Sequence, residues 1–77
     1  MELNDFVKNF AAQFEETDAS EFKPDTEYKL LEEWSSMTSL TIIAMIDDVY
    51  HVQIKGAAIQ NADTIEDLFN QVKVLVP

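Results

Sequence analysis

The chain is short and strongly acidic, and these two properties exclude several classes of protein. Its 77 residues contain 15 Asp and Glu against five Lys and Arg, a formal net charge of −10. So short a chain forms at most one domain, residues 1–77, and so negative a chain is repelled by nucleic acid and by anionic membranes. Because Cys is absent, there is no disulfide, no thiolate metal site and no Cys nucleophile. The chain lacks a signal-peptide start and the roughly 20 apolar residues of a membrane span, so we expect a cytoplasmic protein.

Residues 3–14 predict an amphipathic helix, since their apolar side chains recur at helical spacing on one arc. Residues 15–33 lose this periodicity, are rich in acids and contain Pro24, which bars a continuous helix. They predict a long loop, with one short helical turn at residues 30–33. Apolar side chains anchor this loop to the core: Phe22, Tyr28, Leu30 and Leu31. Trp34 follows, packed either on the start of the next helix or against the loop.

Residues 36–50 predict the central helix, because Ser35 and Ser36 suit a helix start and no Gly or Pro interrupts the run. A wide apolar arc predicts that this helix is buried on most sides: Ile42, Ile43, Ile46, Val49 and Tyr50. The remaining narrow face is either a docking surface or ordinary leftover surface: Met37, Thr41, Ala44 and Asp48. A Ser hydroxyl at the positive end of a helix is also a favourable place for a phosphate.

The last third of the chain predicts an extended connector and two more helices. The alternation of residues 50–55 has no partner strand, so these residues connect elements and pin their apolar side to the core. Gly56 ends the connector and permits a positive φ, and residues 56–61 suffice for one short helix. A last helix begins near residue 64, where Thr64 with Asp67, or Asp63 with Glu66, forms a capping box. The expected fold is all-α, a small four-helix bundle with three longer helices and one short one.

Catalytic and metal sites are weakly indicated. His51 is the only histidine, and a Ser36–His51–Asp47 triad is not expected because Ser36 and His51 stand at opposite ends of one helix, roughly 22 Å apart at 1.5 Å per residue. Asp47, Asp48 and His51 make a poor metal site, because adjacent Asp side chains point in different directions. We therefore expect neither an enzyme nor a metal protein, and the Ser at the start of the central helix is the feature that stands out.

Three segments together resemble the acyl carrier protein family, the phosphopantetheine-binding carrier domains. Residues 34–37, Trp-Ser-Ser-Met, resemble the Asp-Ser-Leu motif at the start of the second of that family's four helices. Residues 47–54 resemble its acidic pair, aromatic residue and extended Val-x-Ile segment, and residues 64–68 resemble the opening of its last helix. The resemblance covers nearly the whole chain and implies a four-helix bundle of acyl-carrier type.

The resemblance implies a function as well as a fold. Ser36 is then the attachment site of 4′-phosphopantetheine, which a phosphopantetheinyl transferase moves from coenzyme A, and the arm carries acyl or aminoacyl groups as thioesters. The implied domain is a monomer that docks on transferring or synthase enzymes with basic patches, through Met37, Thr41, Ala44, Asp47 and Asp48. Ser35 and Thr41 stand where the family usually has acids, which favours a specialised pathway. The alternative is an unmodified interaction module with a carrier-like fold.

Overall fold

The computed structural model describes residues 1–76 and is helical throughout its regular elements. The three longer helices and the short one expected from the sequence are present, and the predicted fold class is confirmed. In chain order the elements are α1 (Leu3–Ala11), the 3₁₀ turns η1 (Ala19–Glu21) and η2 (Tyr28–Leu30), α2 (Ser36–Tyr50), α3 (Gly56–Asn61) and α4 (Ile65–Lys73). Within residues 1–76 no helix has both the length and the apolarity needed to cross a bilayer.

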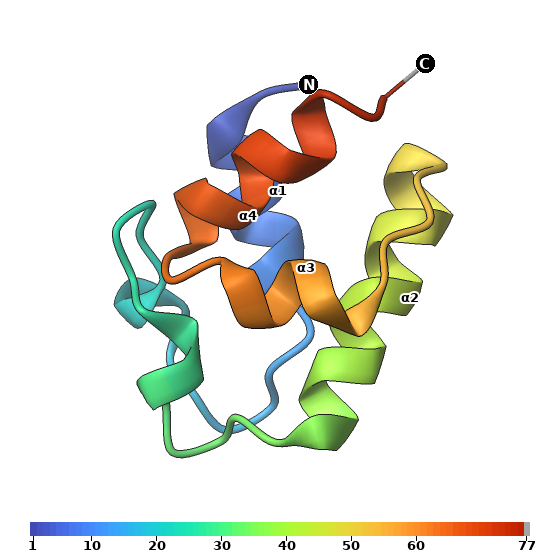
Figure 1. The fold of residues 1–77 in the computed structure, drawn as a ribbon. Helices are drawn as coiled ribbons and strands as arrows, with labels where there is room; N and C mark the ends of the chain where they lie inside the picture. Colours follow the sequence, from blue (N-terminus) through green and yellow to red (C-terminus); the bar gives the residue numbers. More distant parts are fainter. Residues whose placement is uncertain (77) are drawn as a thin grey trace.

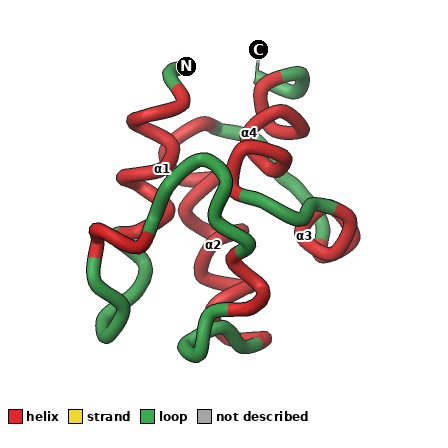
Figure 2. Tube along the Cα trace, turned by 90° about the vertical axis from the view of Figure 1, so that its left-hand side faces the viewer, coloured by secondary structure: helices red, strands yellow, loops and turns green. Residues whose placement is uncertain are grey.

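The four helices contact one another around one hydrophobic core. In Figure 1, α4 lies over α1, α2 runs along one side of the molecule, and α3 lies across the middle between α4 and α2. Figure 2, turned by 90°, shows the N-terminus and the end of α4 together at one end of the molecule. The start of α2 lies toward the opposite end, beside the long α1–α2 connection. The first residues of α2 are therefore remote from the chain termini.

The first helix ends earlier than its periodicity suggests. The predicted helix runs to Phe14, whereas α1 ends at Ala11. Two tight backbone bonds follow it, from the Gln13 N–H to the Phe10 carbonyl (3.2 Å) and from the Phe14 N–H to the Ala11 carbonyl (3.0 Å). These turns tighten the end of the helix but leave Phe14 buried, so the apolar spacing persists beyond the α-helix itself.

Aromatic side chains fill the end of the core that faces the long connection. Phe14 and Phe22 lie 4.8 Å apart between ring centroids, and Tyr28 and Trp34 lie 4.9 Å apart. Trp34 also stacks over Phe10 of α1 at 6.5 Å, and its contact with Tyr28 confirms the predicted position against the loop. Such tilted and offset pairs are favourable contacts beyond the area they bury. This cluster holds an otherwise irregular segment against α1.

One predicted anchor of the loop is wrong. Phe22 and Tyr28 are buried and Leu31 is partly buried, but Leu30 is 78% exposed. The short helical turn expected at residues 30–33 is instead the 3₁₀ turn η2, which ends at Leu30. Successive side chains of a 3₁₀ turn point about 120° apart, so a turn that buries Tyr28 directs Leu30 outward.

The residue with a positive φ is also not the one expected. Gly56 is the first residue of α3 and its φ is not positive, whereas His51 has a φ of 58°. His51 caps the C-terminus of α2, and its N–H donates to the Asp47 carbonyl at 3.0 Å. The chain thus reverses at the end of α2, as helices commonly do through one left-handed residue. After this turn Val52 and Ile54 are buried, which confirms the predicted connector.

Candidate functional site

Ser36 is the first residue of α2, and its side chain is exposed. The residue before it does the capping, since the Thr38 N–H donates to the Ser35 Oγ at 3.3 Å. Within residues 1–76 the Ser36 hydroxyl has no hydrogen-bond partner. The two adjacent serines therefore have different roles: Ser35 caps the helix, and Ser36 presents an exposed hydroxyl.

The start of α2 also keeps its positive partial charge. Its first turn contains no acidic residue. The Ser36 and Met37 N–H groups have no acceptor in the described part of the chain, while the Ser39 N–H donates to the Ser35 carbonyl. Free N–H groups and an uncompensated helix dipole favour an anion at this position. A phosphate ester on Ser36 would lie beside them.

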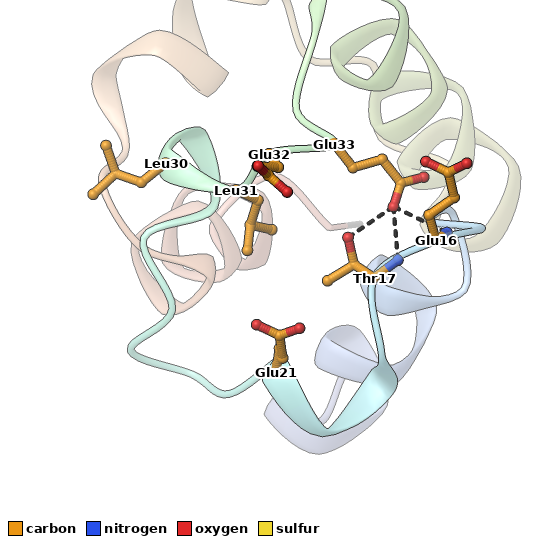
Figure 3. Close-up of a pocket in the computed structure, with 7 residues that line it drawn as sticks. All are labelled: Glu16, Thr17, Glu21, Leu30, Leu31, Glu32 and Glu33. Atoms are coloured by element: carbon orange, nitrogen blue, oxygen red, sulfur yellow. Dashed lines mark hydrogen bonds between the residues drawn. The ribbon is translucent and has the colours of Figure 1, made fainter.

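The segment that leads into α2 is clamped by the carboxylate of Glu33, as Figure 3 shows. Its two oxygens accept N–H bonds from Glu15 (2.9 Å), Glu16 (3.1 Å) and Thr17 (2.9 Å), and a 2.7 Å bond from the Thr17 hydroxyl. The Thr38 hydroxyl in turn donates to the Glu33 carbonyl at 3.0 Å. Glu33 thus joins the end of the α1 region to the first turn of α2, and this fixes the direction in which α2 begins.

The clamp changes the acidity of Glu33. The bond from the Thr17 hydroxyl, followed by the three backbone N–H groups, stabilises the carboxylate and lowers the pKa of Glu33 below its usual value. From the sequence, Glu33 is one acid among many in the loop. Its partners lie 16 to 18 residues away. No local pattern reveals such a contact, so this positioning residue was missed.

A cavity of about 580 Å³ lies beside the clamp, between the two parts of the long connection. Figure 3 draws the side chains around it, several of them acidic: Glu16, Thr17, Glu21, Leu30, Leu31, Glu32 and Glu33. Among residues 1–76 no group of three or more His, Asp or Glu side chains is arranged to hold a metal ion. Because the Glu33 carboxylate already accepts hydrogen bonds from residues 15–17, we assign this cavity no ligand.

A second hollow, of about 420 Å³, lies directly beside Ser36. It runs between the first half of α2 and α3, and its walls combine hydroxyl and apolar groups: Trp34, Ser35, Ser36, Ser39, Leu40, Ile43, Gly56 and Gln60. Gly56, which begins α3, has nothing within 4 Å of the position a Cβ would take. A chain attached to the Ser36 hydroxyl has open space to lie in next to its point of attachment.

The predicted docking residues share one exposed face of α2. Met37 is 73% exposed, and Thr41, Ala44, Asp47 and Asp48 are exposed as well. The Thr41 hydroxyl donates back to the Met37 carbonyl at 3.0 Å and so does not project as a free donor. The spacing of three and four residues brings these side chains onto neighbouring turns of the same surface.

The prediction that α2 is buried on most sides is wrong. Ile42, Met45 and Ile46 are its buried residues, while Leu40 is 63% exposed and Val49 is 48% exposed. The apolar character of α2 extends around the helix, but α1 and α3 cover only part of it. The exposed face is consequently wider and more apolar than expected, and Leu40 is a candidate docking residue that the sequence did not single out.

The other chemical groupings considered from the sequence are not brought together. Ser36 begins α2 and His51 caps its far end, which separates the two side chains by the length of the helix. A Ser–His pair therefore has no geometry for proton transfer.

Comparison of the chain with protein-family models, with curated proteins and with solved structures gave no match.

Proposed function

We propose that the protein is an acyl carrier domain whose Ser36 hydroxyl is the attachment site of 4′-phosphopantetheine. The observation that carries the proposal is the position of Ser36: its side chain is exposed, has no hydrogen bond to any residue of 1–76, and stands first in the second of four helices. Ser35 supplies the N-cap of α2, so the hydroxyl of Ser36 is not used to cap the helix. The resemblance of three segments to carrier domains supports 4′-phosphopantetheine as the attached group.

The residues around Ser36 fit a phosphate ester in charge and space. The start of α2 provides N–H groups that have no acceptor among residues 1–76, and its first turn contains no acid. The hollow between α2 and α3 provides room for the neutral pantetheine portion, with hydroxyl groups and apolar walls. The bound group supplies the thiol on which acyl or aminoacyl cargo is held as a thioester. The domain itself presents the hydroxyl, orients the attached chain and docks on the enzymes that do the chemistry.

The proposed partners are a phosphopantetheinyl transferase and acyl-transferring or synthase enzymes with basic docking patches. A net charge of −10 favours encounter with such surfaces. The proposal includes a cytoplasmic, monomeric domain in a specialised biosynthetic pathway, because Ser35 and Thr41 replace acids that general fatty-acid enzymes commonly meet.

Intact-mass measurement tests the assignment directly. The purified chain is incubated with coenzyme A and a broad-specificity phosphopantetheinyl transferase, and we expect one added phosphopantetheine mass. The Ser36→Ala variant should gain nothing, whereas Ser35→Ala and Ser39→Ala, the matched controls on the same turn, should still be modified. Modification that survives in Ser36→Ala, or its absence from the native sequence, contradicts the proposal.

An unmodified interaction module is the second candidate, and the exposed apolar residues Met37 and Leu40 favour it. It predicts that protein isolated from its own cells carries no added mass at Ser36. The carrier proposal predicts a modified fraction there, detectable by mass spectrometry of the tryptic peptide that contains Ser36.

A further inference from the structure

The backbone around Ser36 sets the position of its hydroxyl oxygen, because that hydroxyl has no hydrogen-bond partner in the described part of the chain. Residues 33–38 form a short segment that is closed on itself around Ser36. Its closing bond runs from the Thr38 hydroxyl to the Glu33 carbonyl, at 3.0 Å. The Thr38 hydroxyl also lies 3.2 Å from that of Ser35, which caps α2. These contacts hold the turn that carries Ser36 without using the Ser36 side chain.

The closed segment is tied to the end of the α1 region through one side chain. Among the residues that the structure describes, every hydrogen bond between residues 15–17 and residues 30–38 ends on the Glu33 carboxylate. The shortest of them, 2.7 Å, comes from the Thr17 hydroxyl (Figure 3). Beside this contact the two parts of the α1–α2 connection separate around the cavity of about 580 Å³. A path of hydrogen bonds therefore runs from Thr17 through Glu33 to the turn that carries Ser36.

We propose that this path positions the Ser36 hydroxyl for phosphopantetheine transfer, which makes Thr17 and Glu33 positioning residues. The inference rests on the proposed function. In the transfer the Ser36 Oγ bonds to the phosphorus next to pantetheine, the pyrophosphate link of coenzyme A breaks, the hydroxyl proton goes to a base of the transferase, and adenosine 3′,5′-bisphosphate leaves. The attack comes roughly in line with the breaking bond, so a turn that is ordered in advance avoids an entropic cost at this step.

Removal of the path should lower kcat for the modification of Ser36 and leave KM unchanged, because the exposed face of α2 is not altered. With a broad-specificity phosphopantetheinyl transferase and coenzyme A, we expect Glu33→Ala to lower kcat about tenfold and Thr17→Val to lower it less. Thr17→Ser keeps the hydroxyl and should restore the native rate. Circular dichroism first establishes that each variant is folded, and Thr17→Val, the milder change, decides the question if Glu33→Ala does not fold.

Two variants in the same connection serve as matched controls. Asp18→Ala removes a carboxylate that accepts an N–H bond from Ser20 at 2.8 Å. Thr26→Val removes a hydroxyl that donates to the Glu21 carbonyl at 2.9 Å. In the described chain both side chains bond only within the connection, so both variants should keep the native kcat and KM. A loss in the controls as large as that in Glu33→Ala would indicate general loosening of the connection and would overturn the proposal.

Amide hydrogen exchange of the unmodified chain tests the path without the transferase. The Thr38 N–H donates to the Ser35 hydroxyl and the Ser39 N–H to the Ser35 carbonyl. In Glu33→Ala and Thr17→Val these two amides should exchange about tenfold faster than in the native chain, while the amides of α4 keep their native rates. The two control variants should leave the exchange of both amides unchanged.

The outcomes distinguish this inference from the function on which it rests. If the native chain is never modified, the proposed function fails and this inference fails with it. If the native chain is modified but Thr17→Val and Glu33→Ala keep its kcat, or keep its exchange rates at the start of α2, the carrier function stands and the positioning role is overturned.

Discussion

The starts of α2 and α4 solve the same structural problem in different ways. At α4 the four leading N–H groups all have acceptors: the carbonyls of Thr26, Pro24 and Thr64, and the Thr64 hydroxyl. Glu66 and Asp67 add negative charge to its first turn, and Asp67 completes a capping box with Thr64. At α2 the N-cap Ser35 provides the acceptors, and the first turn contains no acid. The α4 start is fully compensated, whereas the α2 start is not.

This contrast separates a structural helix start from one that is available for a ligand. Every leading donor of α4 has an acceptor, and those of Ile65 and Glu66 hold the long α1–α2 connection against the last helix. In the part of the chain that the structure describes, the beginning of α2 keeps two N–H groups without an acceptor and an exposed hydroxyl on Ser36, at a cost in stability that full capping would avoid. Stability measurements at the two helix starts, and modification of Ser36, test this difference.

The largest effect on stability is expected at Tyr28, whose hydroxyl bonds to the backbone just before α4. Its buried hydroxyl donates to the Ile59 carbonyl at 2.7 Å and lies 3.3 Å from the Ala62 carbonyl, just before α4. Tyr28→Phe leaves these carbonyls without their partner and should lower the free energy of unfolding by about 1–3 kcal/mol. Urea denaturation followed by circular dichroism measures it. An unchanged midpoint would mean that water replaces the hydroxyl.

The second effect compares the two caps directly. Thr64→Ala removes half of a capping box and should cost about 1–2 kcal/mol, while Ser35→Ala, which removes a single 3.3 Å bond, should cost about 0.5 kcal/mol. Thermal and urea unfolding of both variants measure the two losses of stability. Equal losses would show that the two helix starts are equivalent in energy and would remove the basis of the comparison.

Introducing an acid into the first turn of α2 should raise the stability of the chain and slow the modification of Ser36. The first turn of the native helix has no acid, and Met37→Glu places a carboxylate there. The unmodified chain should therefore gain about 0.3–1 kcal/mol of stability. The same variant should accept phosphopantetheine more slowly, since the new charge lies beside Ser36 and replaces an exposed apolar contact. Met37→Gln is the neutral control. A destabilised Met37→Glu variant would indicate that the dipole of α2 is already compensated.

The sequence predicted the ends of α2 and the capping box of α4 because both depend on neighbouring residues. Ser35 and Ser36 precede an uninterrupted helical run, and Thr64 and Asp67 stand at the spacing a capping box requires. It did not predict that Val49 is exposed, because an apolar residue in a helix does not reveal how many neighbours cover it.

Two features near the candidate site depend on contacts far along the chain. The Glu33 clamp joins residues 15–17 to the entry of α2, and Gln13 in the turn after α1 lines a hollow together with Asp47 of α2. Neither contact has a local signal. The position of Ser36 could therefore be predicted from the sequence, while what orients its helix and what surrounds it could not.

The smallest effect concerns pH, because the carboxylates involved are exposed and screened by solvent. Bonds from the Thr64 and then the Asp63 N–H lower the pKa of Asp67. A lowered pKa in the folded state contributes stability above the ordinary carboxyl pKa, about 4, and that stability is lost as the pH falls through the folded value. The destabilisation by Asp67→Asn should therefore shrink between about pH 7 and about pH 3, whereas that of Ser35→Ala should stay constant because a hydroxyl cap does not titrate in this range. Urea unfolding of both variants at the two pH values measures the difference. Parallel losses would mean that the charge of Asp67 has no part in the cap, and the α4 start would then differ from the α2 start only in its number of hydrogen bonds.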